Sequence, residues 1–225
     1  MSPTISVILP MLNEAAGIQA CLNALAGLRE RGAEVIVVDG GSKDDSVALS
    51  QGLADQFIQA PRGRAKQMMA GATAARANVL LFLHADTRLP EGADRAIANA
   101  LDAGAQWGRF DVKITGRSSM LPVIAAMMNR RSRWSGIATG DQAMFVQREL
   151  FERVGGFPDQ PLMEDIELSK RLRAVAPPAC LPETVLTSGR RWEQHGVWRT
   201  IFLMWRLRWL YWRGVAPATL AAQYK

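Results

Sequence analysis

The sequence predicts an α/β protein with a doubly wound, mostly parallel sheet flanked by helices. Residues 5–9, 35–38 and 79–83 form short apolar, partly β-branched runs, as expected for strands that are buried on both faces. Segments with a helical spacing of apolar residues lie between these runs. Because strand and helix alternate over about the first half of the chain, a parallel sheet is the expected core.

The helices between the strands are predicted from periodicity and from capping residues. Ser42 is expected to cap a helix, with Asp45 close to the exposed amide groups of its first turn. An earlier helix is predicted from five apolar residues at helical spacing: Ile18, Cys21, Leu22, Leu25 and Leu28.

The pattern becomes less regular after Trp107. Residues 108–114 are predicted as a strand of a mixed sheet, and residues 118–134 as either a basic helix or a mobile loop. Pro177-Pro178 interrupts the chain again. Since neither an internal repeat nor a low-complexity linker is found, these segments are expected to belong to one folded unit.

Composition favours one domain with anionic partners. A chain of 225 residues with 48% apolar content can bury a large core. It has 27 Lys and Arg against 21 Asp and Glu, a net charge of +6, which favours phosphates, acidic lipids or nucleic acid. The arginines of the second half are Arg130, Arg131, Arg133, Arg190, Arg191, Arg199, Arg206, Arg208 and Arg213, among others.

The cysteines and the first residues indicate a reducing compartment. Cys21 and Cys180 are far apart and outside any metal-ligand or redox spacing, so no disulfide is expected. Residues 1–4 lead directly into strand-like sequence, without the pattern of a signal peptide. We therefore expect a cytoplasmic protein.

Polar loops follow the first two predicted strands. Asn13 and Glu14 present an amide and a carboxylate, although taken alone the motif favours Asn13 as a simple cap of the next helix. In residues 39–44, Asp-Gly-Gly-Ser-Lys-Asp, the glycines allow close approach of a ligand, and Asp39 can accept hydrogen bonds from a nucleobase or ribose. The alternative is an ordinary turn from strand to helix.

Two further segments offer groups for metal binding and proton transfer. His84-Ala85-Asp86 ends a buried strand; Mg²⁺ prefers a carboxylate, and imidazole suits Mn²⁺ better. The alternative is a structural His84 and a helix-capping Asp86. Glu164-Asp165 can be ordinary charges at a helix start, or one of them can remove a proton from an acceptor hydroxyl.

A basic loop and an acidic turn complete the set of candidate motifs. Arg62, Arg64 and Lys66 surround Gly63 and lead into a predicted helix. Such a loop can bind phosphate through its side chains and the helix amides, and a solvated basic turn fits the pattern equally well. Residues 139–142, Thr-Gly-Asp-Gln, precede a strand-like run, where a carboxylate beside an amide can bind acceptor hydroxyls or serve as a structural turn.

Together these motifs resemble those of the inverting glycosyltransferases of family 2, which have the GT-A fold. Pro10 with Asn13-Glu14, residues 39–44, His84-Ala85-Asp86 and Glu164-Asp165 occur in the family's order and approximate spacing. The resemblance extends from about residue 5 to residue 192. Residues 62–68 and 139–142 are similar to segments of a small bacterial-type subgroup, whose substrates the sequence does not assign.

The resemblance implies a GT-A domain over residues 1–192, with a nucleotide-binding half at 1–106 and an acceptor half at 107–192. It implies transfer of a sugar from a UDP- or GDP-linked donor to a hydroxyl or phosphate acceptor, with Mn²⁺ or Mg²⁺ as cofactor. The implied donor site comprises Pro10, Asn13, Glu14, Asp39, Gly41, Ser42, Asp44, Arg62, Arg64, Lys66 and Ala85. The implied acceptor or diphosphate contacts are Gly140, Asp141, Gln142, Arg191 and Trp192.

For catalysis, the resemblance implies Asp165 as the base with Glu164 as its neighbour, and Asp86 as the metal ligand, joined by His84. The family more often has an acidic residue at the position of His84, so coordination can also rest on Asp86 alone. Residues 188–192 resemble a shortened Gln-x-x-Arg-Trp element in which serine replaces glutamine, which argues against processive polymer synthesis.

Residues 193–225 are predicted as an amphipathic tail. A helix over residues 197–213 is about 25 Å long, shorter than the hydrocarbon layer of about 30 Å, so it should not span a bilayer. A position at the membrane interface, on the inner face, suits it and would fit a lipid-linked acceptor; packing on the catalytic domain or on a second copy is the alternative. Its tryptophan stripe is Trp198, Trp205, Trp209 and Trp212, beside Arg199, Arg206 and Arg213.

Two other classes of function compete with sugar transfer. A nucleotidyltransferase of sugar phosphates would have a related core, but its usual glycine-rich basic signature after the first strand is missing from residues 10–13. A noncatalytic protein that binds anionic lipid or nucleic acid would explain the arginines and tryptophans but not the ordered carboxylates. We expect no nucleic acid partner; the sugar, the acceptor and the oligomeric state stay open.

Overall fold

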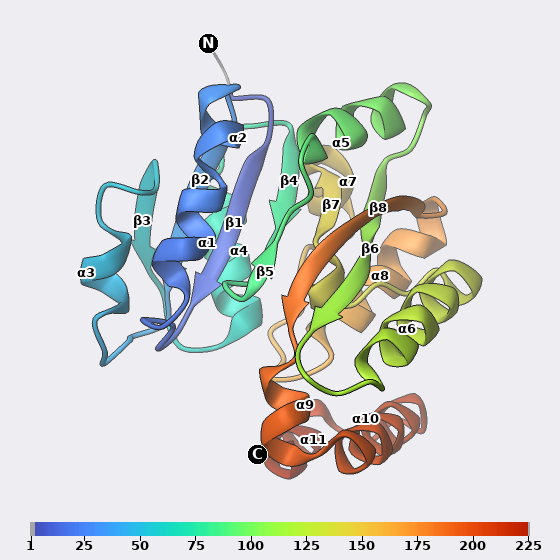
Figure 1. Ribbon diagram of the computed structural model, residues 1–225. Coiled ribbons are helices and arrows are strands. Elements are labelled where there is room, and N and C mark those ends of the chain that lie inside the picture. Colours follow the sequence, from blue (N-terminus) through green and yellow to red (C-terminus); the bar gives the residue numbers. More distant parts are fainter. Residues whose placement is uncertain (1–2, 225) are drawn as a thin grey trace.

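The computed structural model describes residues 3–224 and contains one mixed sheet with helices on both faces (Figure 1). Its strand order is β3-β2-β1-β4-β7-β6-β8-β5. The strands are β1 (Ser6–Met11), β2 (Glu34–Asp39), β3 (Gln56–Gln59), β4 (Val79–Phe82), β5 (Thr87–Arg88), β6 (Trp107–Thr115), β7 (Met144–Gln147) and β8 (Ala179–Ser188).

The helices alternate with the strands and then continue alone at the C-terminal end. They are α1 (Ile18–Ala24), α2 (Ala26–Glu30), α3 (Ser46–Ser50), α4 (Arg64–Ala74), α5 (Ala93–Asp102), α6 (Leu121–Ser135), the 3-10 helix η1 (Gly140–Gln142), α7 (Arg148–Arg153), α8 (Glu164–Val175), α9 (Arg190–His195), α10 (Val197–Trp212) and α11 (Pro217–Gln223).

The strands are buried on both faces, as the apolar runs predict. In β1, Val7 and Leu9 pack with α1, α5 and α6 in one hydrophobic cluster, whereas Ile8 packs with α4, α7 and α8 in another. Successive side chains of a strand point to opposite faces, so an uninterrupted apolar run is needed where helices cover both. Phe82, Phe151 and Phe157 pack edge to face or tilted within the second cluster.

Strand directions confirm a parallel first half and a mixed second half. β1 runs parallel to β2 and β4, and β2 runs parallel to β3. β7 is antiparallel to both β4 and β6, while β6 and β8 are parallel. The carboxyl ends of β1, β2 and β4 therefore meet at one edge, where the loops with Asn13, Ser42 and His84 lie.

Two predicted helix caps need correction, and the structure decides between the helix and the loop predicted after residue 118. Ser42 does not cap a helix, because α3 begins only at Ser46 and the Ser42 hydroxyl donates to Asp39 instead. Asp86 is not a helix cap either, since α5 begins at Ala93 after Gly92 in the left-handed conformation. The segment predicted as a helix or a loop after residue 118 forms the helix α6.

The C-terminal helices pack below the carboxyl ends of β6 and β8 (Figure 1). Leu207 of α10 and Leu220 of α11 are buried against Leu162, Met163 and Ile166 at the start of α8. The inner face of α10 is thus part of the folded body. Among residues 3–224, no helix is both long and apolar enough to cross a membrane.

Gly108→Ala is expected to destabilise the sheet. A Cβ at Gly108 would lie 2.3 Å from the carbonyl oxygen of Ala179 and 2.5 Å from the Phe145 ring. Because backbone is one of the obstacles, the cost should be about 1–3 kcal/mol or more in the free energy of unfolding. Urea titration followed by circular dichroism measures it.

Gly27→Ala in α2 is the matched control for that variant. Its Cβ would make only an ordinary contact of 3.5 Å with Arg31, and alanine is the better helix former by about 1 kcal/mol. The control should be as stable as the parent protein or slightly more stable. An equal urea midpoint for both variants would contradict the packing around Gly108.

Candidate functional site

A cleft of about 590 Å³ opens beyond the carboxyl ends of β1 and β4. Open α/β sheets bind ligands at this edge. The loop after β1, the start of α4, the loop after β4, η1, the start of α8 and the C-terminal helices all contribute to its walls. Its acidic and basic lining residues are Glu14, Arg62, Arg64, His84, Asp86, Asp141, Glu164, Asp165, Arg190, Arg191, His195 and Arg208.

The loops after β1 and β2 hold each other through residues that the sequence assigns to a donor site. The backbone N–H of Asn13 donates to Ser42 Oγ (2.9 Å), and Asn13 Oδ1 accepts from the N–H of Lys43 (2.8 Å). The N–H of Ala15 donates to Asp44 (3.1 Å). Asn13 adopts a left-handed φ of 54°, which asparagine tolerates better than most residues. Asn13, Ser42 and Asp44 therefore shape the loops.

Asp39 is buried at the end of β2, and its carboxylate is used within its own loop. It accepts hydrogen bonds from the N–H of Gly41 (3.0 Å) and from the N–H and hydroxyl of Ser42 (3.1 and 2.6 Å). Gly41 has a φ of 90°, a conformation that favours glycine. Neither Asp39, which is buried, nor Gly41, which is exposed, is among the residues that line the cleft.

Gln67 of α4 joins the two central strand ends. Its Nε2 donates to the carbonyl oxygens of Met11 and Val38, both at 2.8 Å. Gly40 lies so close that a Cβ there would be 2.9 Å from the Gln67 side chain. One buried amide thus fixes the cleft-side ends of β1 and β2.

The basic side chains around the start of α4 point in two directions. Arg64, the first residue of α4, faces the cleft, with Nη1 3.9 Å from Glu164 Oε1. Lys66 points elsewhere and pairs with Asp159 at 3.7 Å on the surface. Arg62 lines the cleft with Arg64. Two of the three predicted cations therefore face the cleft.

His84 is fixed on both ring edges by the loop that contains η1. Its Nδ1 lies 3.3 Å from Asp141 Oδ1, and a Cβ at Gly140 would be 2.3 Å from both Cε1 and Nε2. Burial alone would raise the pKa of Asp141, but the hydrogen bond with His84 and the charges of His84 and Arg64 lower it below its ordinary value. His84 and Asp141 thus stabilise one another beside the cleft.

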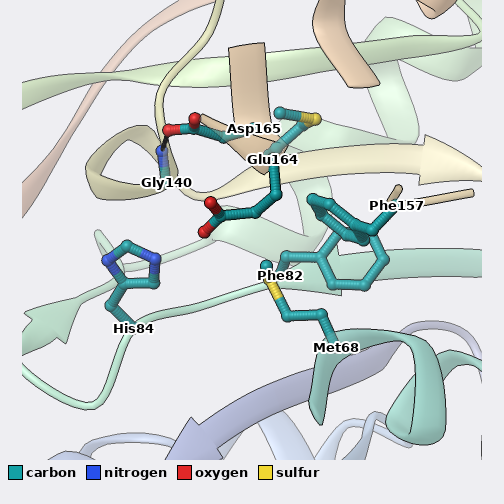
Figure 2. Close-up of a pocket in the computed structure, with 8 residues that line it drawn as sticks. Met68, Phe82, His84, Gly140, Phe157, Glu164 and Asp165 are labelled. Carbon is teal, nitrogen blue, oxygen red and sulfur yellow. Dashed lines mark hydrogen bonds between the residues drawn. The ribbon is translucent and has the colours of Figure 1, made fainter. Parts of the chain in front are cut away.

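Glu164 and Asp165 begin α8 directly after Met163, which has a left-handed φ of 65°. Asp165 Oδ2 accepts from the N–H of Gly140 (2.9 Å), and Oδ1 accepts from the N–H of Ile166 (2.7 Å). Figure 2 shows the first of these bonds, with the Glu164 carboxylate directed toward His84. The sharp turn at Met163 delivers both carboxylates to the cleft, where the helix N-terminus stabilises their charge.

An apolar wall stands beside Glu164. Met68, Phe82 and Phe157 surround a void of about 10 Å³ next to the Glu164 side chain (Figure 2). Burial, reinforced by the negative charge of Asp165, raises the pKa of Glu164 above its ordinary value, and Arg64 only partly offsets this. The two neighbouring carboxyl groups therefore have different environments, one apolar and one hydrogen-bonded.

Asp86 is an exposed carboxylate on the wall of the cleft after β4. Thr87 Oγ1, at a long 3.4 Å, is its hydrogen-bond neighbour. Within residues 3–224, no group of three or more histidine, cysteine, aspartate and glutamate side chains converges as a preformed metal cage.

Arg208 and Tyr224 also line the cleft, although the sequence motifs did not identify them. Arg208 lies on α10 next to the buried Leu207, and burial lowers its pKa although Asp165 and Asp141 counteract this. The Arg191 guanidinium stacks 3.7 Å over the Tyr224 ring and donates to the Tyr224 carbonyl oxygen. The signal available in the sequence was that Arg208 falls outside the helical stripe that Arg199, Arg206 and Arg213 share.

The cleft brings together most, but not all, of the residues that the sequence singles out. Those that line it are Pro10, Glu14, Arg62, Arg64, His84, Ala85, Asp86, Gly140, Asp141, Glu164, Asp165, Arg191 and Trp192. Those outside its lining are Asn13, Asp39, Gly41, Ser42, Asp44, Lys66 and Gln142. Gln142 is fully buried, where its Oε1 accepts from the N–H of Thr139 (3.2 Å).

Residues 6–157 match the sequence profile of the family described as glycosyl transferase family 2. This match covers more than half of the chain. The chain belongs to glycosyl transferase family 2. An uncharacterised glycosyltransferase of Mycobacterium tuberculosis (strain ATCC 25618 / H37Rv) is 28% identical over 193 residues, covering 80% of this chain and 72% of that protein.

Solved structures confirm the GT-A fold expected for a family 2 glycosyltransferase. Residues 1–349 of TarS from S. aureus, in complex with UDP, align with a TM-score of 0.66 at 17% identity, over 82% of this chain and 60% of that one. A mannosyltransferase from Pyrobaculum calidifontis, in complex with GDP-Man and Mn²⁺, aligns with a TM-score of 0.59 at 22% identity, over 83% and 57%. This chain therefore spans little more than half of these larger proteins.

Glu164→Gln is expected to stabilise the fold increasingly as the pH rises. Because the folded-state pKa of Glu164 is raised, its favourable contribution is complete below the ordinary glutamate pKa and is lost as the pH rises through the folded value. A neutral glutamine avoids that loss. The difference in Tm between the variant and the parent protein should therefore grow from pH 4 to pH 8 in differential scanning fluorimetry.

Glu149→Gln, which changes an exposed carboxylate on α7, is the control. Its Tm difference from the parent protein should stay nearly constant over the same pH range. A constant difference for Glu164→Gln as well would contradict the assigned environment of Glu164.

Proposed function

We propose that this family 2 glycosyltransferase transfers a sugar from a nucleotide-sugar donor to a hydroxyl or phosphate acceptor, with inversion at the anomeric carbon. The observation that carries the proposal is the single cleft that Asp86, Glu164, Asp165 and flanking arginines share. Related folds with UDP or with GDP-Man and Mn²⁺ support a nucleotide-linked donor. UDP- and GDP-linked sugars are the donors to test.

The proposed donor site begins at the loop after β1. Pro10 and Glu14 line this end of the cleft, and Glu14 Oε2 lies 3.3 Å from Arg190 Nη2 of α9. A nucleobase and ribose are placed here, with Asp39 acting through the shape of the neighbouring loop. The diphosphate is placed where Arg64 and Arg191 line the cleft. A guanidinium group can donate two parallel hydrogen bonds to phosphate oxygens.

The groups at Asp86 fit a divalent cation held largely by the donor. Mg²⁺ commonly binds proteins through one or two carboxylates together with substrate phosphates and water, and Asp86 supplies one exposed carboxylate. His84 fits less well, because Asp141 and Gly140 occupy its two ring edges. We therefore place Mn²⁺ or Mg²⁺ at Asp86 and assign His84 to positioning the η1 loop. A bound cation would neutralise the charge of the departing diphosphate.

In the proposed reaction, the acceptor oxygen attacks the anomeric carbon opposite the diphosphate. The bond from that carbon to the β-phosphate oxygen breaks, and the nucleoside diphosphate leaves with the bonding electrons. Asp165 takes the proton of an acceptor hydroxyl, while the N–H groups of Gly140 and Ile166 hold its carboxylate in place. A single displacement of this kind inverts the configuration.

Asp86→Ala and Asp165→Asn should each abolish most of the release of nucleoside diphosphate. Loss of a general base typically costs about 10²–10⁴-fold in rate. The assay pairs UDP- and GDP-sugars with Mn²⁺ and a panel of hydroxyl and phosphate acceptors. Asp102→Asn, exposed at the end of α5, is the control and should keep full activity.

Two results would contradict the proposed function. One is full activity in a folded Asp86→Ala or Asp165→Asn variant. The other is release of pyrophosphate from a nucleoside triphosphate and a sugar phosphate, which would identify a nucleotidyltransferase. Anomeric configuration in the product, read by proton NMR coupling constants, tests inversion directly.

We further propose that the outer face of α10 binds an anionic membrane surface, on the cytoplasmic side. Trp198, Phe202, Trp205, Trp209 and Trp212 are exposed along this helix, and the Trp212 side chain is 76% exposed. The Arg213 guanidinium lies 5.3 Å from the centroid of the Trp209 ring. Indoles at headgroup depth with adjacent guanidinium groups are typical of an interfacial helix on acidic lipids.

A Trp205→Ser, Trp209→Ser double variant should lose binding to anionic vesicles by about 10-fold or more, since it removes two large apolar anchors. Flotation with phosphatidylcholine vesicles containing phosphatidylglycerol measures the bound fraction. Phe57→Ser on the edge strand β3 is the control, because Phe57 is an exposed aromatic remote in the sheet order from the C-terminal helices. Equal flotation of the double variant and the parent protein would contradict the membrane surface.

A further inference from the structure

The position of the Arg191 side chain depends on Tyr224, which lies 33 residues further along the chain. The Arg191 guanidinium stacks on the Tyr224 ring, with Cζ 3.7 Å from the ring centroid, and its Nη2 donates to the Tyr224 carbonyl oxygen at 3.0 Å. Both residues line the cleft. A planar guanidinium is attracted to an aromatic face by its charge and fits it by its shape. The stack and the hydrogen bond together therefore fix the plane and one corner of the guanidinium.

The contacts with Tyr224 are compatible with phosphate binding by Arg191. A guanidinium has five N–H groups, and stacking uses its face instead of these donors. The hydrogen bond to the Tyr224 carbonyl oxygen uses one of the five. A bidentate phosphate contact needs two parallel N–H groups. Burial raises the pKa of Tyr224, although the charges of Arg191 and Arg64 oppose this, so the phenol is neutral and does not repel a phosphate.

Tyr224 is held in turn by the hydrophobic cluster at the start of α8. Its side chain packs against the cluster that includes Met163, Leu207 of α10 and Leu220 of α11. Met163 is the residue whose turn delivers the two carboxylates of α8 to the cleft. One apolar cluster thus positions both carboxylates and, through Tyr224, the guanidinium of Arg191.

Holding an arginine in place before its ligand arrives favours binding. Arginine has many rotamers, and an arginine that is free in solvent loses this freedom when it binds a ligand. Where the side chain is already ordered in the folded protein, that loss has occurred on folding and no longer opposes binding.

We propose that Tyr224 positions Arg191 for the donor diphosphate, by holding its guanidinium in the cleft before the nucleotide sugar binds. The inference rests on the proposed function and adds to it a positioning residue that acts through Arg191. It makes α11 part of the donor site, although this helix is far in the chain from the loops after β1 and β2.

Titration calorimetry of the full chain with Mn²⁺ tests this inference, with UDP and GDP as probes. Tyr224→Leu keeps a large apolar side chain and the backbone carbonyl but removes the aromatic face, so the variant should fold. It should weaken binding of the preferred nucleotide by about 3–10-fold, as expected when one long side chain must be ordered on binding. Tyr224→Phe keeps the aromatic face and should bind as the wild type does.

Tyr211→Leu is the matched control, because it removes a ring from the same hydrophobic cluster. The Tyr211 ring also has a cation nearby, Lys170 Nζ at 4.7 Å from its centroid, but Tyr211 is not among the residues that line the cleft. This variant loses the hydrogen bond to Glu167 and should have a lower Tm, yet it should bind the nucleotide as the wild type does. An equal loss of affinity in Tyr211→Leu and Tyr224→Leu would overturn the inference, since packing alone would then explain it.

A double-mutant cycle separates positioning from direct contact with the donor. Arg191→Gln should weaken nucleotide binding by about 10-fold or more, because it removes charge-assisted hydrogen bonds. In that background Tyr224→Leu should have no further effect, because the ring acts through the missing guanidinium. Additive losses would overturn the inference, as would unchanged affinity in Tyr224→Leu alone. Tighter binding in Tyr224→Leu would overturn it as well, by showing that the ring obstructs the cleft.

Failure of this inference is distinguishable from failure of the proposed function. If UDP or GDP binds and Arg191→Gln leaves its affinity unchanged, the diphosphate lies elsewhere, and the role of Tyr224 fails while sugar transfer stands. If no nucleoside diphosphate or nucleotide sugar binds the wild type at all, the proposed function itself fails, and the role of Tyr224 fails with it.

Discussion

Charge balance around the start of α8 is the constraint on which the site depends. Two adjacent carboxylates cannot both be held out of water without compensation. Met163 turns the chain so that Glu164 meets an apolar wall and Arg64, while Asp165 accepts two backbone N–H bonds. The helix N-terminus supplies further positive potential. These two neighbouring carboxylates thereby acquire different environments, which suits the proton transfer proposed for Asp165.

The need to pair buried polar groups also explains why several residues predicted to bind the ligand instead hold the loops after β1 and β2 in place. The carboxylate of Asp39 accepts hydrogen bonds from Gly41 and Ser42, so it fixes the loop after β2. Asn13 bridges that loop to the one after β1. Backbone polar groups at strand ends must be paired, and here short polar side chains pair them. A donor meeting these loops would find them already ordered, which lowers the entropy lost on binding.

Much of the fold follows from patterns that involve only neighbouring residues. The apolar runs at β1, β2 and β4 predict their burial, and strand alternation places His84 and Asp86 at the shared carboxyl edge. What the pattern could not supply is orientation. Whether Asp39 faces a ligand or its own loop depends on φ at Gly41, and whether Ser42 caps a helix depends on where α3 begins. Arg208 was missed because its role depends on how α10 packs against α8.

The two faces of α10 connect these observations, because helix geometry fixes them relative to each other. Leu207 is buried against the start of α8 while Trp205 and Trp209 point outward, so the rotation that seats the helix also turns Arg208 into the cleft. On the proposed function, a membrane that takes up the indoles lies on the acceptor side, across Asp165 from the loops after β1 and β2. A soluble donor could then enter from the aqueous side while a lipid-linked acceptor approaches from the bilayer. Separate approaches allow both substrates to be bound together, as a single displacement demands.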